Sequence, residues 1–178
     1  GAEGSKAWFE AAAEAYGVDS ERTQQVLEMP YQRAKRAVSV HRSKLEGKRI
    51  HFLPDSQLEI PMARFLSEEC GLSVNEIGTP FHDHLVMRGE LARLPQDVPM
   101  VEGQDLDPAL ARVRAARPDL TVCGMGIANA LESEGLRTKW SIELVFSPVQ
   151  GFDQAGDLAG LFAKPLAREE ILEVGSWS

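Results

Sequence analysis

Residues 135–143 hold the side chains with the clearest binding chemistry in the sequence. They read Gly-Leu-Arg-Thr-Lys-Trp-Ser-Ile-Glu and place Trp140 between Lys139 and Ser141, at the mouth of the last expected strand. An indole offers a broad, flat apolar surface, and its two neighbours add an ammonium group and a hydroxyl. The group could therefore bind a flat apolar ligand that carries polar substituents. The residue types alone favour the alternative, in which Trp140 packs in the core.

Two other motifs suggest a nucleotide or a metal ion, but their spacing favours simpler interpretations. Residues 124–129 follow a strand as a dinucleotide fingerprint would, yet Asn129 replaces the third glycine of GxGxxG, so a close turn is the preferred interpretation. His82 and His84 flank Asp83. In a helix, two histidines at this spacing point about 200° apart, and no third ligand follows. We expect the solvated start of a helix there and no metal site.

Neither cysteine has the surroundings of a catalytic nucleophile or of a metal-binding pair. Cys70 and Cys123 are the only two in the sequence and lie far apart. Cys70 follows Glu68 and Glu69, whose charges disfavour the thiolate. Cys123 ends an apolar strand, where a cysteine behaves as a small buried hydrophobe. We expect neither a disulfide framework nor a metal ligand from these residues.

The composition is that of a soluble globular protein. The chain has 178 residues, of which 43% are apolar, and this is enough for one sizeable core. Its formal net charge is −8, and the acidic excess lies after residue 47. A surface of that sign repels phosphate backbones and argues against nucleic acid as a partner. No apolar run approaches the roughly 20 residues of a membrane span, and the first residues lack a basic signal-peptide region, so we expect a cytoplasmic protein.

The hydrophobic pattern changes near residue 48. Before it, the spacing predicts two helices, the second capped by Asp19 or Ser20 and bent or split near Pro30. After it, short apolar runs predict strands at 49–53, 72–77, 98–101, 119–123 and 141–146, with helices around 60–66, 85–94, 106–116 and 152–163 between and after them. This alternation is typical of βαβ units. We predict an α/β protein with a doubly wound, mostly parallel, Rossmann-like three-layer domain and an N-terminal helical arm.

The same pattern divides the chain into three parts. We expect a helical arm or connector at 1–47, the α/β domain at 48–166 and a C-terminal tail at 167–178. Ligands of such domains gather at the carboxyl ends of the strands. The segments expected at those ends are 54–56, 78–80, 103–105, 124–126 and 147–148.

Four runs of the sequence are specific enough to point to a family. They are KRIHFLPDSQLEIPMARFL at 48–66, EGQD at 102–105, RAARPDLTVCGMG at 114–126 and EGLRTKWSIELVFSPVQGFDQAGDLAGLFAKPL at 134–166. The segments PDSQLE, TKWSIE and GFDQAGDLA are not generic strand or helix solutions. With these runs, nearly the whole chain resembles the C-terminal part of the N subunit of the light-independent (dark-operative) protochlorophyllide reductases, a nitrogenase-like oxidoreductase family.

The resemblance implies a role in (bacterio)chlorophyll synthesis. In that family, two N and two B subunits form a heterotetramer that reduces the C17=C18 bond in ring D of protochlorophyllide, and a transient, ATP-driven L protein delivers the electrons. A [4Fe–4S] cluster passes them to the pigment. Three cysteines near the amino terminus of the N subunit and one aspartate of the B subunit hold this cluster. Those cysteines have no counterpart here, so the resemblance implies no cluster ligand from this chain and no activity of this chain alone.

The resemblance also implies which residues meet the substrate. Trp140 matches the TKWS segment and is expected to line the protochlorophyllide cavity, with Lys139 and Ser141 beside it. Residues 147–159 also resemble the end of the α chain of the nitrogenase molybdenum–iron protein, where a histidine just upstream holds the metal cofactor. Ser141 stands near that place and suits an organic substrate. Two alternatives stay open: the related chlorophyllide reductase, which reduces ring B, and a non-catalytic tetrapyrrole-binding or scaffold module.

Overall fold

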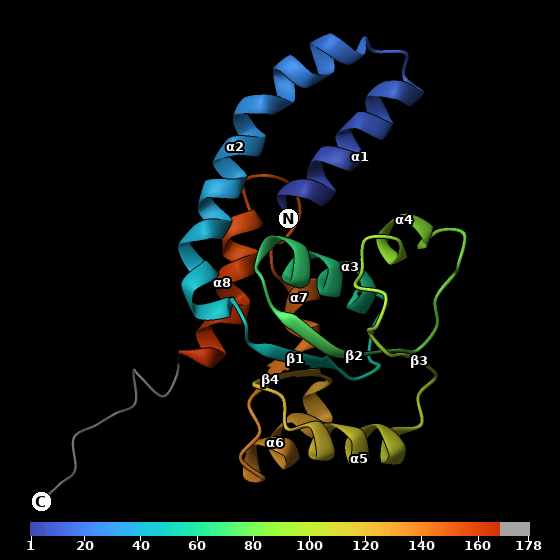
Figure 1. Cartoon of the computed structure of the whole chain (residues 1–178), viewed down its shortest axis with the longest axis vertical. Helices are drawn as coiled ribbons and strands as arrows, with labels where there is room; N and C mark the ends of the chain where they lie inside the picture. The colour runs from blue at the N-terminus through green and yellow to red at the C-terminus, as the bar shows by residue number, and fades with distance from the viewer. Residues whose placement is uncertain (168–178) are drawn as a thin grey trace, which may run out of the picture.

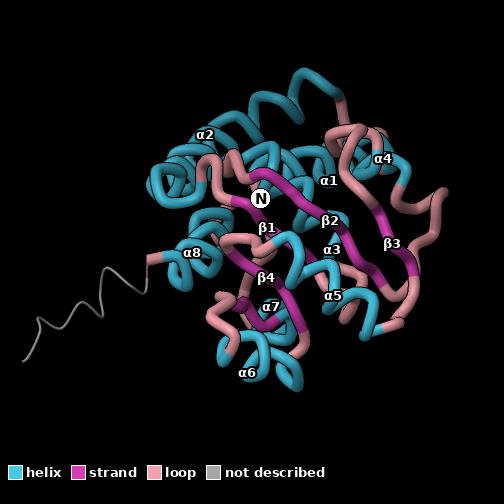
Figure 2. Tube along the Cα trace, turned by 60° about the horizontal axis from the view of Figure 1, so that its bottom comes forward, coloured by secondary structure: helices cyan, strands magenta, loops and turns pink. Residues whose placement is uncertain are grey.

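The computed structural model describes residues 1–167. Within them, five parallel strands form one sheet in the order β3-β2-β1-β4-β5. Figure 2 shows β3, β2, β1 and β4 side by side. The strands are β1 (Arg49–Phe52), β2 (Ser73–Thr79), β3 (Met100–Glu102), β4 (Leu120–Cys123) and β5 (Thr138–Trp140). The chain thus starts the sheet in the middle, builds outward on one side through β2 and β3, and then crosses to the other side. This is the doubly wound arrangement that the sequence predicts.

Helices cover both faces of the sheet and complete three layers. In Figure 1, α5 (Leu106–Ala116) and α6 (Met125–Ser133) lie on one face. The other face is covered by α2 (Ser20–Leu45), α3 (Glu59–Arg64) and α8 (Ala155–Leu166). The core is correspondingly split. One cluster of buried side chains includes Phe52 and Phe162, and a smaller one includes Leu53 and Leu131. The successive β4 residues Val122 and Cys123 belong to different clusters, so they face opposite sides of the sheet, as the pleat requires.

The first two helices form a hairpin. Helix α1 (Ala2–Ala15) runs beside the first half of α2, and the Tyr31 hydroxyl donates to Glu3 Oε1 over 2.5 Å. The predicted cap of α2 is confirmed, because Asp19 Oδ2 accepts from the Arg22 amide at 2.9 Å. The helix continues through Pro30, so the predicted split is absent from it, and Figure 1 shows α2 curving along its length. Its second half packs closely on α8.

The sequence predictions for residues 85–94 and 141–146 are wrong. Residues 141–146 form a helix, α7 (Ser141–Phe146), and the fifth strand is the short β5 before it. Ser141 and Leu144 are buried while Val145 is exposed, and this spacing of three suits a helix. The run resembled a strand because three of its exposed residues, Ile142, Val145 and Phe146, are also apolar. Similarly, of the helix expected at 85–94, only α4 (Arg88–Leu91) forms an α-helical turn.

The remaining segments join these elements. A short π-helix (Phe65–Glu69) continues α3. No helix within residues 1–167 combines the length and the apolar character needed to cross a membrane. Most of the predicted C-terminal tail, 168–178, lies outside the described residues.

Candidate functional site at the carboxyl edge of the sheet

Trp140 lies at the last position of β5, at the carboxyl edge of the sheet. Strand β5 pairs with β4 in parallel, with Cys123 opposite Trp140. The indole keeps 40% of its surface exposed, so it is not sealed inside the layers. Core packing, the alternative that the residue types favoured, therefore does not describe it. An exposed indole at the edge where α/β sheets collect their ligands is available for a flat apolar molecule.

The two neighbours of Trp140 point inward. Lys139 is only 5% exposed, and its ammonium group donates to the Glu143 carboxylate, four residues along the chain. Ser141 is 3% exposed, and its hydroxyl contacts the Asp55 carboxylate and the Cys123 carbonyl oxygen, the latter at 3.2 Å. Their polar groups are engaged by the protein itself. In this structure they support the segment that carries Trp140.

Other apolar side chains are exposed near the same edge. They follow the ends of β2, β4 and β5. They are Phe81, Met125, Ile142, Val145 and Phe146, with Phe146 82% exposed. Strands β2 and β5 are three intervals apart, about 14 Å at the usual strand spacing. Exposed apolar side chains thus occur at several strand ends along this edge, with Trp140 on its β5 side.

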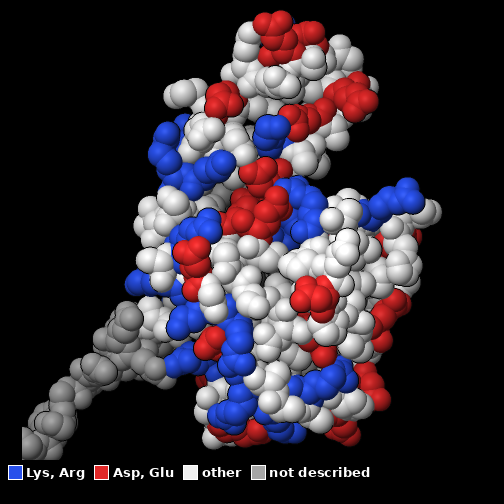
Figure 3. All heavy atoms as spheres, viewed as in Figure 1, with Lys and Arg blue, Asp and Glu red and all other residues white. Residues whose placement is uncertain are grey.

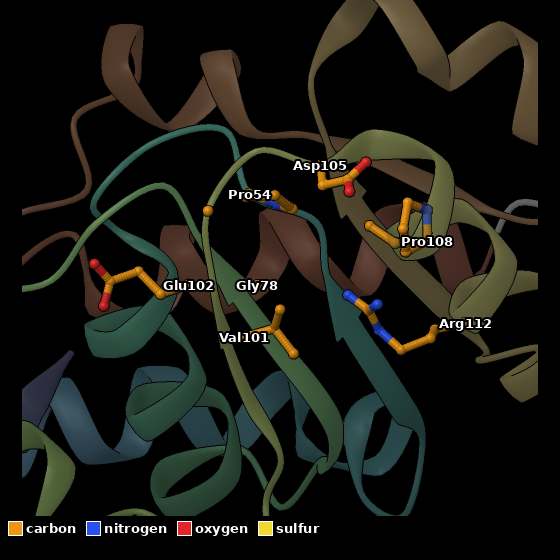
Figure 4. A pocket seen from close by; sticks show the side chains of 9 residues that line it. Pro54, Gly78, Val101, Glu102, Asp105, Pro108 and Arg112 are labelled. Carbon is orange, nitrogen blue, oxygen red and sulfur yellow. The ribbon is translucent and has the colours of Figure 1, made fainter.

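A cavity of about 210 Å³ opens on the α5 side of the same edge. It is lined by residues at the ends of β2 and β3, by Pro54 after β1, and by α5 and the loop before it (Figure 4). Figure 4 shows Arg112 and Val101 facing one another across it, while the Glu102 carboxylate points away. The Arg112 guanidinium is held by Glu76, with Nε 2.8 and 2.9 Å from the two carboxylate oxygens. The cavity is smaller than the 300–1,000 Å³ typical of organic ligand sites, so the open edge at Trp140 is the better candidate.

The predictions for the histidine pair are only partly correct. His82 is buried, which contradicts the expected solvated start of a helix, and its Nδ1 lies 3.2 Å from Glu102 Oε2. His84 is exposed, as expected. Asp83 forms a turn by accepting from the amides of Leu85 and Val86. In residues 1–167, no three His, Cys, Asp or Glu side chains lie in a group that could hold a metal ion.

The glycine motif and the cysteines have structural explanations. The close turn predicted at 124–129 is wrong, because Met125–Ser133 form α6 and Gly124 is its N-cap. A Cβ at Gly124 would lie 2.6 Å from Asp55 Oδ1, so glycine at this position leaves room for that carboxylate. Cys70 and Cys123 are buried in separate core clusters. Burial raises the pKa of each thiol to about 12. An iron–sulfur cluster needs converging thiolates, and these two thiols do not fit that requirement.

The sequence did not identify Asp55 as part of the site. It is separated from Ser141 by 86 positions, and only the pairing of β1 with β4 and of β4 with β5 brings them together. The sequence contains only an indirect indication that Asp55 lies near the site. Asp55 belongs to the segment 54–56, which the strand pattern already placed at the carboxyl edge.

The charged surface is mixed. On the face shown in Figure 3, Lys and Arg alternate with Asp and Glu over the sheet domain, and acidic groups gather at the tip of the α1–α2 hairpin. This face carries no single basic surface of the kind that binds nucleic acid.

Comparisons with known proteins agree on one family. The model of the nitrogenase component 1 type oxidoreductases matches residues 1–166. Light-independent protochlorophyllide reductase subunit N of Halorhodospira halophila (strain DSM 244 / SL1) is 59% identical over 98% of this chain, and that of Acidiphilium rubrum is 56% identical over 98%. The chain spans 41% of the length of each. The solved structure "Nitrogenase Cp1 at pH 5" covers 100% of this chain and 43% of its own, with a TM-score of 0.76 and 12% identity, which shows a shared fold.

Proposed function

Because this chain belongs to the nitrogenase component 1 type oxidoreductase family, we propose that it is the C-terminal part of the N subunit of a light-independent protochlorophyllide reductase. It forms one wall of the protochlorophyllide cavity and part of the subunit interface. The complex of two N and two B subunits reduces ring D in the cytoplasm, with electrons from the L protein. The observation that carries the site assignment is the exposed indole of Trp140 at the end of β5.

The chemistry of the ligand fits this surface. A tetrapyrrole is flat and largely apolar, and such ligands bury most of their area against apolar and aromatic walls. Stacking on Trp140 would fix the plane of the macrocycle, while Met125 and Phe146 would exclude water from its edges. The residues of this chain thus bind and orient the pigment.

The cluster that the family implies belongs, in this proposal, to other parts of the complex. Cys70 and Cys123 are separated by the sheet and keep their protons because burial raises both pKa values. We therefore assign no electron-transfer step to this chain.

Substituting Trp140 in the complete N–B complex tests the proposal. Removing one face of an indole exposes roughly 100 Å² of apolar contact, worth about 2.5 kcal/mol or a factor of roughly 60 in the dissociation constant. We expect Trp140→Ala to weaken protochlorophyllide binding by this order and Trp140→Phe to weaken it less. Binding is measured from the absorption change of the pigment on titration.

Trp8→Ala is the matched control, since Trp8 is also exposed but lies on α1, away from the sheet edge. It should bind pigment like the unmodified complex. Equal affinities for the Trp140→Ala, Trp8→Ala and unmodified complexes would remove Trp140 from the site. Titration with chlorophyllide a in parallel distinguishes this assignment from a chlorophyllide reductase, which would prefer that pigment.

A further inference from the structure

Side-chain hydrogen bonds tie together four neighbouring strand ends at the carboxyl edge. The groups involved are Thr79 at the end of β2, Asp55 and Glu59 after β1, the Cys123 carbonyl at the end of β4, and Ser141 after β5. These bonds are separate from the backbone ladder of the sheet. They connect the PDSQLE segment to the TKWS segment, two of the specific runs in the sequence.

Glu59 fixes the loop that follows β1. Its side chain is 2% exposed, and Oε1 accepts from the amides of Asp55 at 3.2 Å and Ser56 at 2.5 Å, and from the Ser56 hydroxyl at 3.0 Å. Its Oε2 accepts from Thr79 Oγ1 at 3.3 Å. Burial raises the pKa of Glu59, and the hydrogen bonds oppose that rise. A buried carboxylate with this many donors holds the loop in one conformation.

Asp55 reaches from that fixed loop to the segment that carries Trp140. Its carboxylate accepts the hydrogen bond of the Ser141 hydroxyl. On its other side lies Gly124, where a Cβ would be 2.6 Å from Oδ1 and 3.2 Å from Cγ. The Ser141 hydroxyl thus holds the carboxylate on one side. On the other side, the missing side chain of Gly124 leaves the space that the carboxylate occupies.

Resting on the function proposed above, we propose that Asp55 is a positioning residue for the tetrapyrrole site. By holding Ser141, it sets how the chain turns from β5 into α7, and so which face the Trp140 indole presents to the pigment. Asp55 is exposed while Ser141 is buried, so their hydrogen bond is partly shielded from water. The bond ties the loop after β1 to the buried start of α7, directly beside the indole.

Four substitutions in the complete N–B complex test the role of Asp55. Asp55→Ala removes the acceptor, and Asp55→Asn keeps an acceptor oxygen of the same size. Gly124→Ala leaves Asp55 in place but displaces its carboxylate, because the end of a short side chain moves more easily than backbone. Gly126→Ala is the matched control, since a Cβ there has nothing within 4 Å.

We expect Asp55→Ala and Gly124→Ala each to raise the dissociation constant for protochlorophyllide about tenfold and to shift the absorption of the bound pigment. Asp55→Asn should retain most of the affinity, and Gly126→Ala should match the unmodified complex. When Trp140 is already alanine, Asp55→Ala should weaken binding no further, because the group that it positions is gone.

Three results would contradict the inference. The first is unchanged affinity and pigment spectrum in folded Asp55→Ala and Gly124→Ala complexes, which would make the contact merely structural. The second is a full additional loss from Asp55→Ala in the Trp140→Ala complex, which would mean that Asp55 acts independently. The third is an equal loss in Gly126→Ala. A Trp140→Ala complex with normal affinity would instead overturn the proposed function, so the two failures are distinguishable.

Discussion

Replacing Gly156 with alanine should destabilise the chain through the contact between α8 and α2. A Cβ at Gly156 would lie 2.8 Å from the Cβ of Ala37 and 3.3 Å from its carbonyl carbon and oxygen. These atoms belong to the backbone of a long helix or are fixed to it, so the two helices must separate. Overpacking of this kind costs about 1–3 kcal/mol. The better helix propensity of alanine returns about 1 kcal/mol, so a net loss of about 1 kcal/mol remains.

Gly160 provides the control, because it lies one turn further along the same helix. A Cβ there would lie 3.2 Å from His41 Nε2, the end of a side chain that can turn away. The higher helix propensity of alanine should therefore outweigh the small cost of moving His41, and Gly160→Ala should leave the free energy of unfolding unchanged or raise it slightly. Thermal unfolding followed by circular dichroism measures both, and a loss of 1 kcal/mol lowers Tm by about 2–4 °C at this chain length. An unchanged or higher Tm for Gly156→Ala, or equal losses for both variants, would refute the argument.

Three further outcomes follow from buried polar groups. Arg64→Met should lower the free energy of unfolding by about 3–5 kcal/mol in a denaturant titration, because it leaves the buried Glu69 carboxylate without the guanidinium 2.6 Å away. Burial lowers the pKa of His51, so the unfolded chain binds its proton first and stability should fall as pH drops below about 6.5. His51→Gln should flatten that fall when Tm is compared between pH 7.5 and 5.5, and an unchanged slope would contradict it. Cys70 and Cys123 should resist a thiol reagent at pH 8 until the chain unfolds, and rapid labelling of the folded chain would disprove their burial.

Much of the fold could be predicted from the sequence because it depends on local patterns. Short apolar runs between helical segments gave the α/β class and four of the five strand positions approximately. The cap at Asp19 is also a local signal. The effect of Pro30 was harder to predict, because α2 continues through this residue although its missing amide removes one helical hydrogen bond. The segment 141–146 was misassigned because most of its exposed side chains are apolar, and exposed apolar residues obscure the periodicity that distinguishes a helix from a strand.

The candidate site was less accessible to sequence reasoning because it is assembled from distant residues. Trp140 stood out by its type and its place at the end of a strand. The inward orientation of Lys139 and Ser141 could not be predicted from the sequence, because it depends on their contacts with Glu143 and Asp55. His82 looked like a solvated residue among polar neighbours, and only the fold places it against Glu102.

The two predictions about glycine connect stability with the proposed site. Gly156 lets α8 approach α2 closely behind the sheet, and Gly124 lets Asp55 approach the end of β4 at its carboxyl edge. The first contact joins two long elements and should register in the free energy of unfolding. The second joins short loops around an exposed indole and should register in pigment affinity instead. If Gly124→Ala lowered Tm as much as Gly156→Ala while leaving affinity intact, the carboxyl edge would be part of the structural framework, and its polar contacts would need no ligand to explain them.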